Sequence, residues 1–163
     1  MQFYIKPEHF AKKTSFTIRD EKKNRLFQVR GTFFFGLRRL SIKDMNSQLL
    51  YRAKRRFDIT FFKKYTIDDE KNNIIAEIYR TRGVRQPKFK IKALDKLVTI
   101  DGDLYGHEFS IRDEENALLA SMGKRVFPSG EAYEIDVPSE KKPLLFLFII
   151  IVLDQFLHER AKR

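Results

Sequence analysis

The sequence predicts a mainly β fold: a closed antiparallel barrel of about twelve strands around a central hydrophobic C-terminal helix. Two observations carry this prediction. A short alternating phrase recurs along most of the chain, and an unbroken run of ten apolar residues lies near its end. Because the chain has 163 residues, we expect a single domain over 1–163, with the barrel over 2–137 and the helix over 143–160.

The recurring phrase alternates apolar and polar residues before a polar turn. Its clear copies are 16–20, 40–44, 65–69 and 109–113, and its weaker copies are 89–93 and 133–137. Successive copies start 24, 25, 24, 20 and 24 residues apart, a fixed period typical of stacked or closed repeat folds. Each copy is followed by a second alternating strand, which indicates a β-hairpin. Together with an opening strand near 2–6, these hairpins form a long meander, and closure would remove its exposed edges.

An aspartate ends each clear copy of the phrase. These residues are Asp20, Asp44, Asp69 and Asp113. Repeated carboxylates raise the possibility of acid–base catalysis, which needs two such groups facing one pocket. Repetition around a barrel separates them, and Asp side chains bond nearby backbone groups in turns. We therefore interpret these aspartates as turn formers.

The apolar run lies over 144–153 and reads LLFLFIIIVL. Pro143 suits the first position of a helix, where its missing N–H costs nothing. A membrane span needs roughly 20 apolar residues, so this run is too short. A helix that is apolar on every side is buried on every side, and a barrel of this width needs filling. We expect a central buried helix; a tail dipping into a membrane and a buried strand are the alternatives.

Asp154 follows the apolar run directly. We expect the helix to emerge into water at this residue. The alternative is a buried Asp154 that pairs with an Arg or Lys of the barrel wall, since an unpaired buried charge is expensive.

The composition is that of a folded protein with a strongly basic balance. Lys and Arg number 33 against 22 Asp and Glu, which gives a net charge of +11. Such an excess favours anionic partners, although it also serves solubility. The chain has no cysteine, which excludes disulfides and thiol catalysis. Residues 1–20 lack the apolar core of a signal peptide, so we expect a cytoplasmic protein, with association at the periphery of a membrane as an option.

The hairpin phrases, the linking segments 31–36 and 102–106, and the apolar run 144–156 together resemble the LURP-one-related family, including its bacterial YxjI-like members. The resemblance spans nearly the whole chain. It implies a twelve-stranded barrel around a hydrophobic helix, similar to the tubby C-terminal domain and the phospholipid scramblases. Tubby domains bind phosphoinositide head groups through basic surface residues. The family carries no agreed catalytic residues, and this chain lacks the Cys-rich segment and membrane anchor of scramblases.

No catalytic or metal-binding motif is present in the sequence. His9, His107 and His158 are scattered, without the paired spacing of a zinc site. We interpret His107 as a packing residue between a loop and a strand. There is neither a G-x-S-x-G nucleophile elbow nor a phosphate loop. We therefore expect no catalytic residues, no metal and no cofactor, and a protein that is not an enzyme.

Basic residues crowd the middle of the chain, where they alternate with apolar ones. Alternation places Lys88, Lys90 and Lys92 on the outer face of one strand and Arg52, Lys54 and Arg56 on that of another, and neighbouring strands would merge these rows into one cationic field. Surface lysines also protect strand edges, so the pattern alone does not establish a site. The predicted anion- or lipid-binding residues are Arg52, Lys54, Arg56, Lys63, Lys64, Arg80, Arg82, Lys88, Lys90 and Lys92.

The leading hypothesis is a non-enzymatic module that binds anionic lipid head groups, or another phosphorylated polyanion, at a membrane surface. The second hypothesis is that the protein binds nucleic acid. It rests on aromatic residues interleaved with basic ones, which would stack on bases if exposed: Phe33–Phe35, Phe57 and Phe61–Phe62. A core role for these rings is the simpler interpretation. An enzyme acting at the barrel mouth and a regulatory partner protein without a ligand remain as further hypotheses.

Overall fold

The structure is a computed structural model that describes residues 1–6, 15–34, 37–57, 63–81, 88–138 and 140–158. Within these residues it contains one helix, α2 (Pro143–His158), and twelve strands. The strands are β1 (Gln2–Ile5), β2 (Ser15–Arg19), β3 (Arg25–Phe34), β4 (Leu37–Asp44), β5 (Leu49–Phe57), β6 (Lys63–Asp69), β7 (Ile74–Thr81), β8 (Lys88–Ala93), β9 (Lys96–Asp103), β10 (Glu108–Arg112), β11 (Leu118–Phe127) and β12 (Gly130–Asp136).

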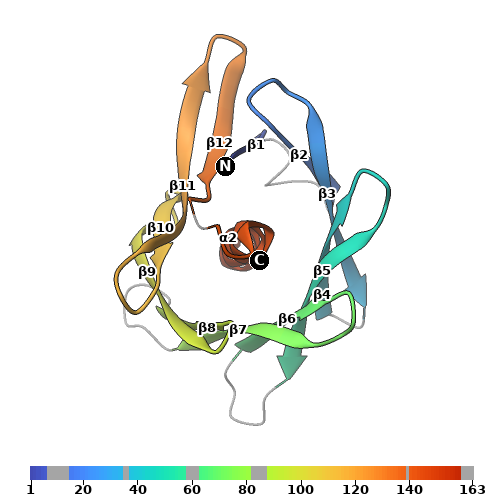
Figure 1. Cartoon of the computed structure of the whole chain (residues 1–163), viewed down its shortest axis with the longest axis vertical. Helices are drawn as coiled ribbons and strands as arrows, with labels where there is room; N and C mark the ends of the chain where they lie inside the picture. The colour runs from blue at the N-terminus through green and yellow to red at the C-terminus, as the bar shows by residue number, and fades with distance from the viewer. Residues whose placement is uncertain (7–14, 35–36, 58–62, 82–87, 139, 159–163) are drawn as a thin grey trace.

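The strands form one closed antiparallel barrel in which each strand pairs with its neighbours in sequence, and β1 also pairs with β12. Figure 1 shows this ring with α2 running through its middle. The fold predicted from the repeats is therefore confirmed. Pairing is uneven around the ring: β1 has four residue pairs with β12 but a single pair, Tyr4 with Arg19, with β2.

The repeated aspartates close the hairpin turns, as predicted. In the turn between β6 and β7, Oδ1 of Asp69 accepts hydrogen bonds from the backbone N–H groups of Lys71 and Asn73, both at 2.9 Å. Asn72 adopts a left-handed backbone with φ of 65°, a conformation that Asn tolerates well. Asp44 and Asp113 accept the equivalent pairs of backbone bonds, and Asp20 binds the backbone and side chain of Asn24.

Antiparallel order gives the barrel two different ends. The turn end carries the hairpin turns 20–24, 44–48, 69–73, 93–96 and 113–117. The connector end carries the links between hairpins, including 104–107 and 128–129. Strand β12 finishes at the turn end, so α2 enters the barrel there and runs towards the connector end.

The core is a helix sealed inside the strand wall. Every residue from Leu145 to Leu153 is at most 4% exposed. The wall meets the helix with apolar side chains from alternate strand positions, among them Ile18, Ile42, Ile67 and Ile78, each 0% exposed. Burying one such side chain contributes about 1.5–3 kcal/mol, so the helix and the wall stabilise each other. The expected central buried helix is thus confirmed, and its predicted end at residue 160 lies outside the described residues.

Candidate functional site: an outer basic face

Four neighbouring strands, β5 to β8, bring most of the predicted site residues together on the outside of the barrel. Ala53, Ile67, Ile78 and Ile91 point into the core, so the residues that alternate with them point outwards. We define the basic face by its outward cations. They are Arg52, Lys54 and Arg56 on β5, Lys64 on β6, and Lys88, Lys90 and Lys92 on β8.

Strand register aligns these cations into rows across the face. Arg56 is paired with Lys64, Lys64 with Tyr79 of β7, and Tyr79 with Lys90. The next row runs from Lys54 through Thr66 and Glu77 to Lys92. Three strand spacings of about 4.8 Å separate the cations of β5 from those of β8 by about 14 Å. The rows between them make a continuous surface that suits a layer of phosphates.

Two carboxylates within the face neutralise part of its charge. Lys54 Nζ lies 3.2 Å from Asp68 Oδ2, and Asp68 is buried beneath that lysine. Lys64 Nζ lies 2.8 Å from Glu77 Oε1. The hydrogen bond between the last two groups raises the pKa of Lys64 and lowers the pKa of Glu77, and the Tyr79 hydroxyl, which donates to Glu77, acts in the same directions. Lys54 and Lys64 are therefore held in place by their ion pairs, and they contribute less to the positive electrostatic potential of the face than the unpaired cations do.

The positive charge that remains available to bind an anion comes from the two outer strands of the face, β5 and β8. Arg56 donates through Nε to Thr66 Oγ1 at 3.3 Å, which leaves the other guanidinium nitrogens for a ligand. Lys92 lies 3.9 Å from Asp95, a carboxylate that is itself fully solvated. Arg52 and Lys90 form no ion pair with any described residue. These cations are the ones we expect to meet an anion.

Three predicted site residues are not part of this described surface. Arg80 alternates with the core residues Ala76 and Ile78, so it belongs to the inward row near the connector end of β7. Strict alternation therefore assigns Arg80 to the side opposite the basic face, and the structure does not bring it together with the other predicted residues. The Lys63 side chain and all of Arg82 lie outside the described residues.

Strand register also adds residues that the prediction left out. Arg39 of β4 is in register with Lys54, and Arg30 of β3 is in register with Ser41, which is in register with Arg52. The basic surface thus continues onto β3 and β4. Alternation in the sequence already indicated that Arg30 and Arg39 point outwards. Only the pairing of β4 with β5, however, shows that they lie next to the basic face.

The strands that follow β8 around the ring carry a different charge. On β9 and β10 the outward positions include Asp101, Asp103 and Glu108, with Arg112 as a basic exception. Glu134 and Asp136 occupy outward positions on β12. On the described strands the outward cations are therefore most numerous from β3 to β8, with single ones such as Arg19 and Arg125 elsewhere.

A second polar cluster lies at the connector end, where α2 meets the link between β9 and β10. Asp154 is 0% exposed, and its Oδ1 lies 2.5 Å from Nδ1 of His107. The ring of His107 lies 4.7 Å from the ring of Tyr133 on β12. Burial raises the pKa of Tyr133, and the carboxylate of Asp154 raises it further. The expectation that Asp154 meets water was wrong. The link between β9 and β10 covers α2 at this residue, and His107 of that link contacts the Asp154 carboxylate.

Several other predictions are not settled by the structure. His9 and the side chain of His158 lie outside the described residues, as do the side chains of Phe33, Phe57, Phe61 and Phe62 on which the nucleic-acid hypothesis rested. Among the described residues, no group of three or more His, Cys, Asp or Glu side chains is arranged to hold a metal ion. The absence of a metal, a cofactor and an enzymatic activity stays a prediction. No described helix is long and apolar enough to cross a membrane.

The fold and face define a plugged antiparallel barrel with one basic side, and sequence comparison gives it a family. The model of the LURP-one-related family matches residues 1–154, so the chain belongs to that family. It is 28% identical over 158 residues to the "Uncharacterized protein YxjI" of Bacillus subtilis, covering 97% of this chain and 94% of that protein. An X-ray structure of an Arabidopsis thaliana protein superimposes with a TM-score of 0.67 at 15% identity, over 96% of this chain and 90% of that one. This last likeness concerns the fold alone.

Proposed function

We propose that the protein is a non-enzymatic module, working in the cytoplasm, that docks on membrane surfaces by binding anionic lipid head groups with its basic face. The observation that carries this proposal is the register of β5 to β8. It sets Arg52 and Arg56 on one edge of a smooth outer wall and Lys90 and Lys92 on the other. Such a surface suits a layer of phosphates better than a single enclosed substrate.

The magnitude of the attraction is sufficient for reversible docking. Clustered Lys and Arg near an anionic leaflet contribute about 1 kcal/mol each, a contribution that salt weakens. The acidic positions on β9 and β10 are repelled by the same leaflet. Attraction at β5 to β8 and repulsion at the strands that follow them in the ring would orient the barrel with β5 to β8 against the lipid.

The packing of the barrel supports a binding role over catalysis. Small-molecule active sites are concave and enclosed. Here the lumen is filled from Leu145 to Leu153 by side chains that are almost completely buried. The interior of the described barrel therefore offers little room for a substrate, and the outer wall is the surface left for recognition.

Lipid is favoured over nucleic acid by the character of the face. Proteins that bind single strands combine cations with aromatic rings on which bases stack. Among the described side chains of the basic face, Tyr79 is the aromatic one, and Lys64 Nζ lies 4.9 Å from the centre of its ring. That ring is already occupied by a cation, so the face offers charge rather than stacking.

Vesicle sedimentation tests this proposal directly. The protein is mixed with vesicles of neutral phosphatidylcholine and with vesicles that also contain acidic lipid, at low and at high salt. We expect sedimentation with the acidic vesicles only, and its loss at high salt. Equal binding to both compositions, or binding to neither, contradicts the proposal. Tighter binding to a labelled single-stranded DNA than to acidic vesicles would favour the nucleic-acid hypothesis instead.

A further inference from the structure

The barrel wall is weakest where β1 meets β2. Tyr4 and Arg19 form the single residue pair between these strands. No other residues of these two strands are paired with each other, and β2 also has a register shift between Ile18 and Arg19 on its other edge. The ladder of backbone hydrogen bonds is therefore short at this seam.

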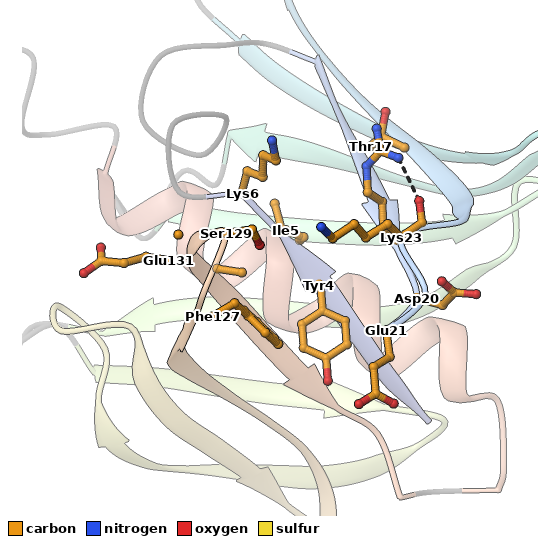
Figure 2. Close-up of a pocket in the computed structure, with 13 residues that line it drawn as sticks. Tyr4, Ile5, Lys6, Thr17, Asp20, Glu21, Lys23, Phe127, Ser129 and Glu131 are labelled. Carbon is orange, nitrogen blue, oxygen red and sulfur yellow. Dashed lines mark hydrogen bonds between the residues drawn. The ribbon is translucent and has the colours of Figure 1, made fainter.

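A cavity of about 390 Å³ occupies this seam, within the size range of small-molecule sites. Its lining comes from four places in the chain: the end of β1, β2 with its following turn, the link between β11 and β12, and the start of β12. Figure 2 shows the residues that line it. The rings of Tyr4 and Phe127 form an aromatic floor, with their centres 5.4 Å apart and their planes at 77°.

Charges of both signs line the seam cavity, but the protein already uses two of the carboxylates. Asp20 accepts two hydrogen bonds from Asn24, which help to lower its pKa. Glu131 pairs with Lys124 at 2.8 Å. Glu21 is the third carboxylate; in Figure 2 it lies at the hydroxyl end of the Tyr4 ring.

The cations of the cavity are less engaged. Arg19 donates through Nη1 to the backbone oxygen of Lys23 at 2.9 Å, which keeps its remaining nitrogens available. Neither Lys6 nor Lys23 forms an ion pair with a described residue. Figure 2 shows both lysine side chains on the far side of Tyr4 from the Glu21 carboxylate. The lining therefore places three cations beside an aromatic floor, with three carboxylates in the same lining.

We propose that the seam cavity is a second binding site, specific for a phosphate monoester attached to an apolar body. Lys6, Lys23 and Arg19 bind the phosphate, and Tyr4 and Phe127 contact the body. Both elements are needed, because solvated lysines alone bind phosphate weakly. A soluble aromatic phosphate and a lipid phosphate share this chemistry.

The seam cavity is independent of the basic face. In the ring order, β1 and β2 lie across the barrel from β7, and Figure 1 shows them on opposite sides of α2. None of the residues of the basic face lines the cavity. The two sites can therefore be tested with separate substitutions, and the failure of one proposal leaves the other standing.

Titration by two-dimensional NMR with phenyl phosphate tests the proposal. We expect saturable shifts at Tyr4, Thr17 and Ala132, and affinity weakened about tenfold by Lys23→Gln, with partial rescue by Lys23→Arg. Lys22→Gln is the matched control, because Lys22 is the neighbouring turn residue and does not line the cavity. The control and a variant carrying Arg52→Gln, Lys90→Gln and Lys92→Gln should both bind as the unchanged protein does.

Further ligands distinguish the sources of the phosphate. Monomeric dihexanoyl phosphatidic acid binding more tightly than phenyl phosphate would assign the site to a lipid, and the reverse order to a soluble aromatic phosphate. Inorganic phosphate binding as tightly as both would overturn the proposal, since the aromatic floor would then contribute nothing. The absence of saturable shifts, or equal effects of Lys22→Gln and Lys23→Gln, would overturn it as well.

Discussion

Nδ1 of His107 lies 2.5 Å from Oδ1 of Asp154, and this contact joins the connector end of the barrel to the helix inside it. The two residues are 47 positions apart in sequence. Asp154 is completely buried, whereas the side chain of His107 is 18% exposed. His107 reaches the helix from a left-handed backbone conformation, with φ of 59°. A polar contact thus joins the barrel to α2 at the residue that follows the buried apolar run from Leu145 to Leu153.

The first prediction concerns this contact. Replacing His107 with Ala leaves the buried carboxylate of Asp154 without its imidazole, and removing one partner of a buried pair costs about 3–5 kcal/mol. We expect a decrease in the free energy of unfolding near the lower end of that range, measured by urea denaturation. A double-mutant cycle with Asp154→Asn isolates the pair. A coupling energy near zero would show that the contact contributes nothing.

The second prediction concerns the apolar helix. Ile149 is 0% exposed, so Ile149→Ala should leave a cavity in the core and lower the free energy of unfolding by about 2–5 kcal/mol. Val126→Ala is the control, because Val126 is 75% exposed and its truncation should change stability by less than about 0.5 kcal/mol. Similar losses for both variants in urea denaturation would argue against a helix sealed in the barrel.

The third prediction concerns the hairpin turns. Asp69→Ala removes the acceptor of the Lys71 and Asn73 backbone N–H groups, which should destabilise the protein by about 1–2 kcal/mol. Asp69→Asn keeps an oxygen at the same place and should retain most of the stability. Thermal unfolding followed by circular dichroism separates the two variants. Equal melting temperatures for Ala and Asn would mean that the side-chain acceptor is not what closes the turn.

The fourth prediction is a pH dependence set by Glu77. The hydrogen bond from Lys64 lowers the pKa of Glu77 from its ordinary value of 4.5, so folding favours the charged carboxylate. The stabilisation is present above that value and is lost as the pH falls through the lowered pKa. Glu77→Gln should therefore be less stable than the unchanged protein at pH 6, with the difference shrinking towards pH 3.

Urea denaturation across this pH range measures the effect, and Glu108→Gln is its control. The carboxylate of Glu108 is exposed and pairs with no described cation, so Glu108→Gln should be about as stable as the unchanged protein at pH 6. A Glu77→Gln difference that stays constant from pH 6 to pH 3 would contradict the linkage.

The sequence was sufficient for the architecture because its information there is local and repeated. Alternation fixes which residues of β5 or β8 point outwards, and the recurring Asp marks four of the five hairpin turns at the turn end. The length and uniform hydrophobicity of 144–153 leave few places for that segment other than the lumen. Each of these signals is contained within about ten residues and does not depend on distant contacts.

The finer features depend on register and distant contacts, which a single sequence does not supply. The environment of Asp154 was predicted wrongly because a charged residue after an apolar run usually lies where a helix becomes exposed to water. The contact with His107, which is 47 residues away in sequence, is visible only in the folded structure. Arg80 is different, because its parity with Ile78 was present in the sequence and only had to be applied to that strand. The seam cavity is lined by four segments that are distant in sequence, and no local residue pattern predicts that they meet.

The basic face is tested most directly by sedimenting two variants of equal net charge with acidic vesicles. One carries Arg52→Gln, Lys90→Gln and Lys92→Gln, and the other carries Lys22→Gln, Arg112→Gln and Lys124→Gln, which lie outside β3 to β8. At about 1 kcal/mol for each cation, the first variant should bind at least tenfold more weakly than the unchanged protein, and the second should bind almost as well. Equal losses in the two variants would show that only net charge matters, and would contradict a localised face.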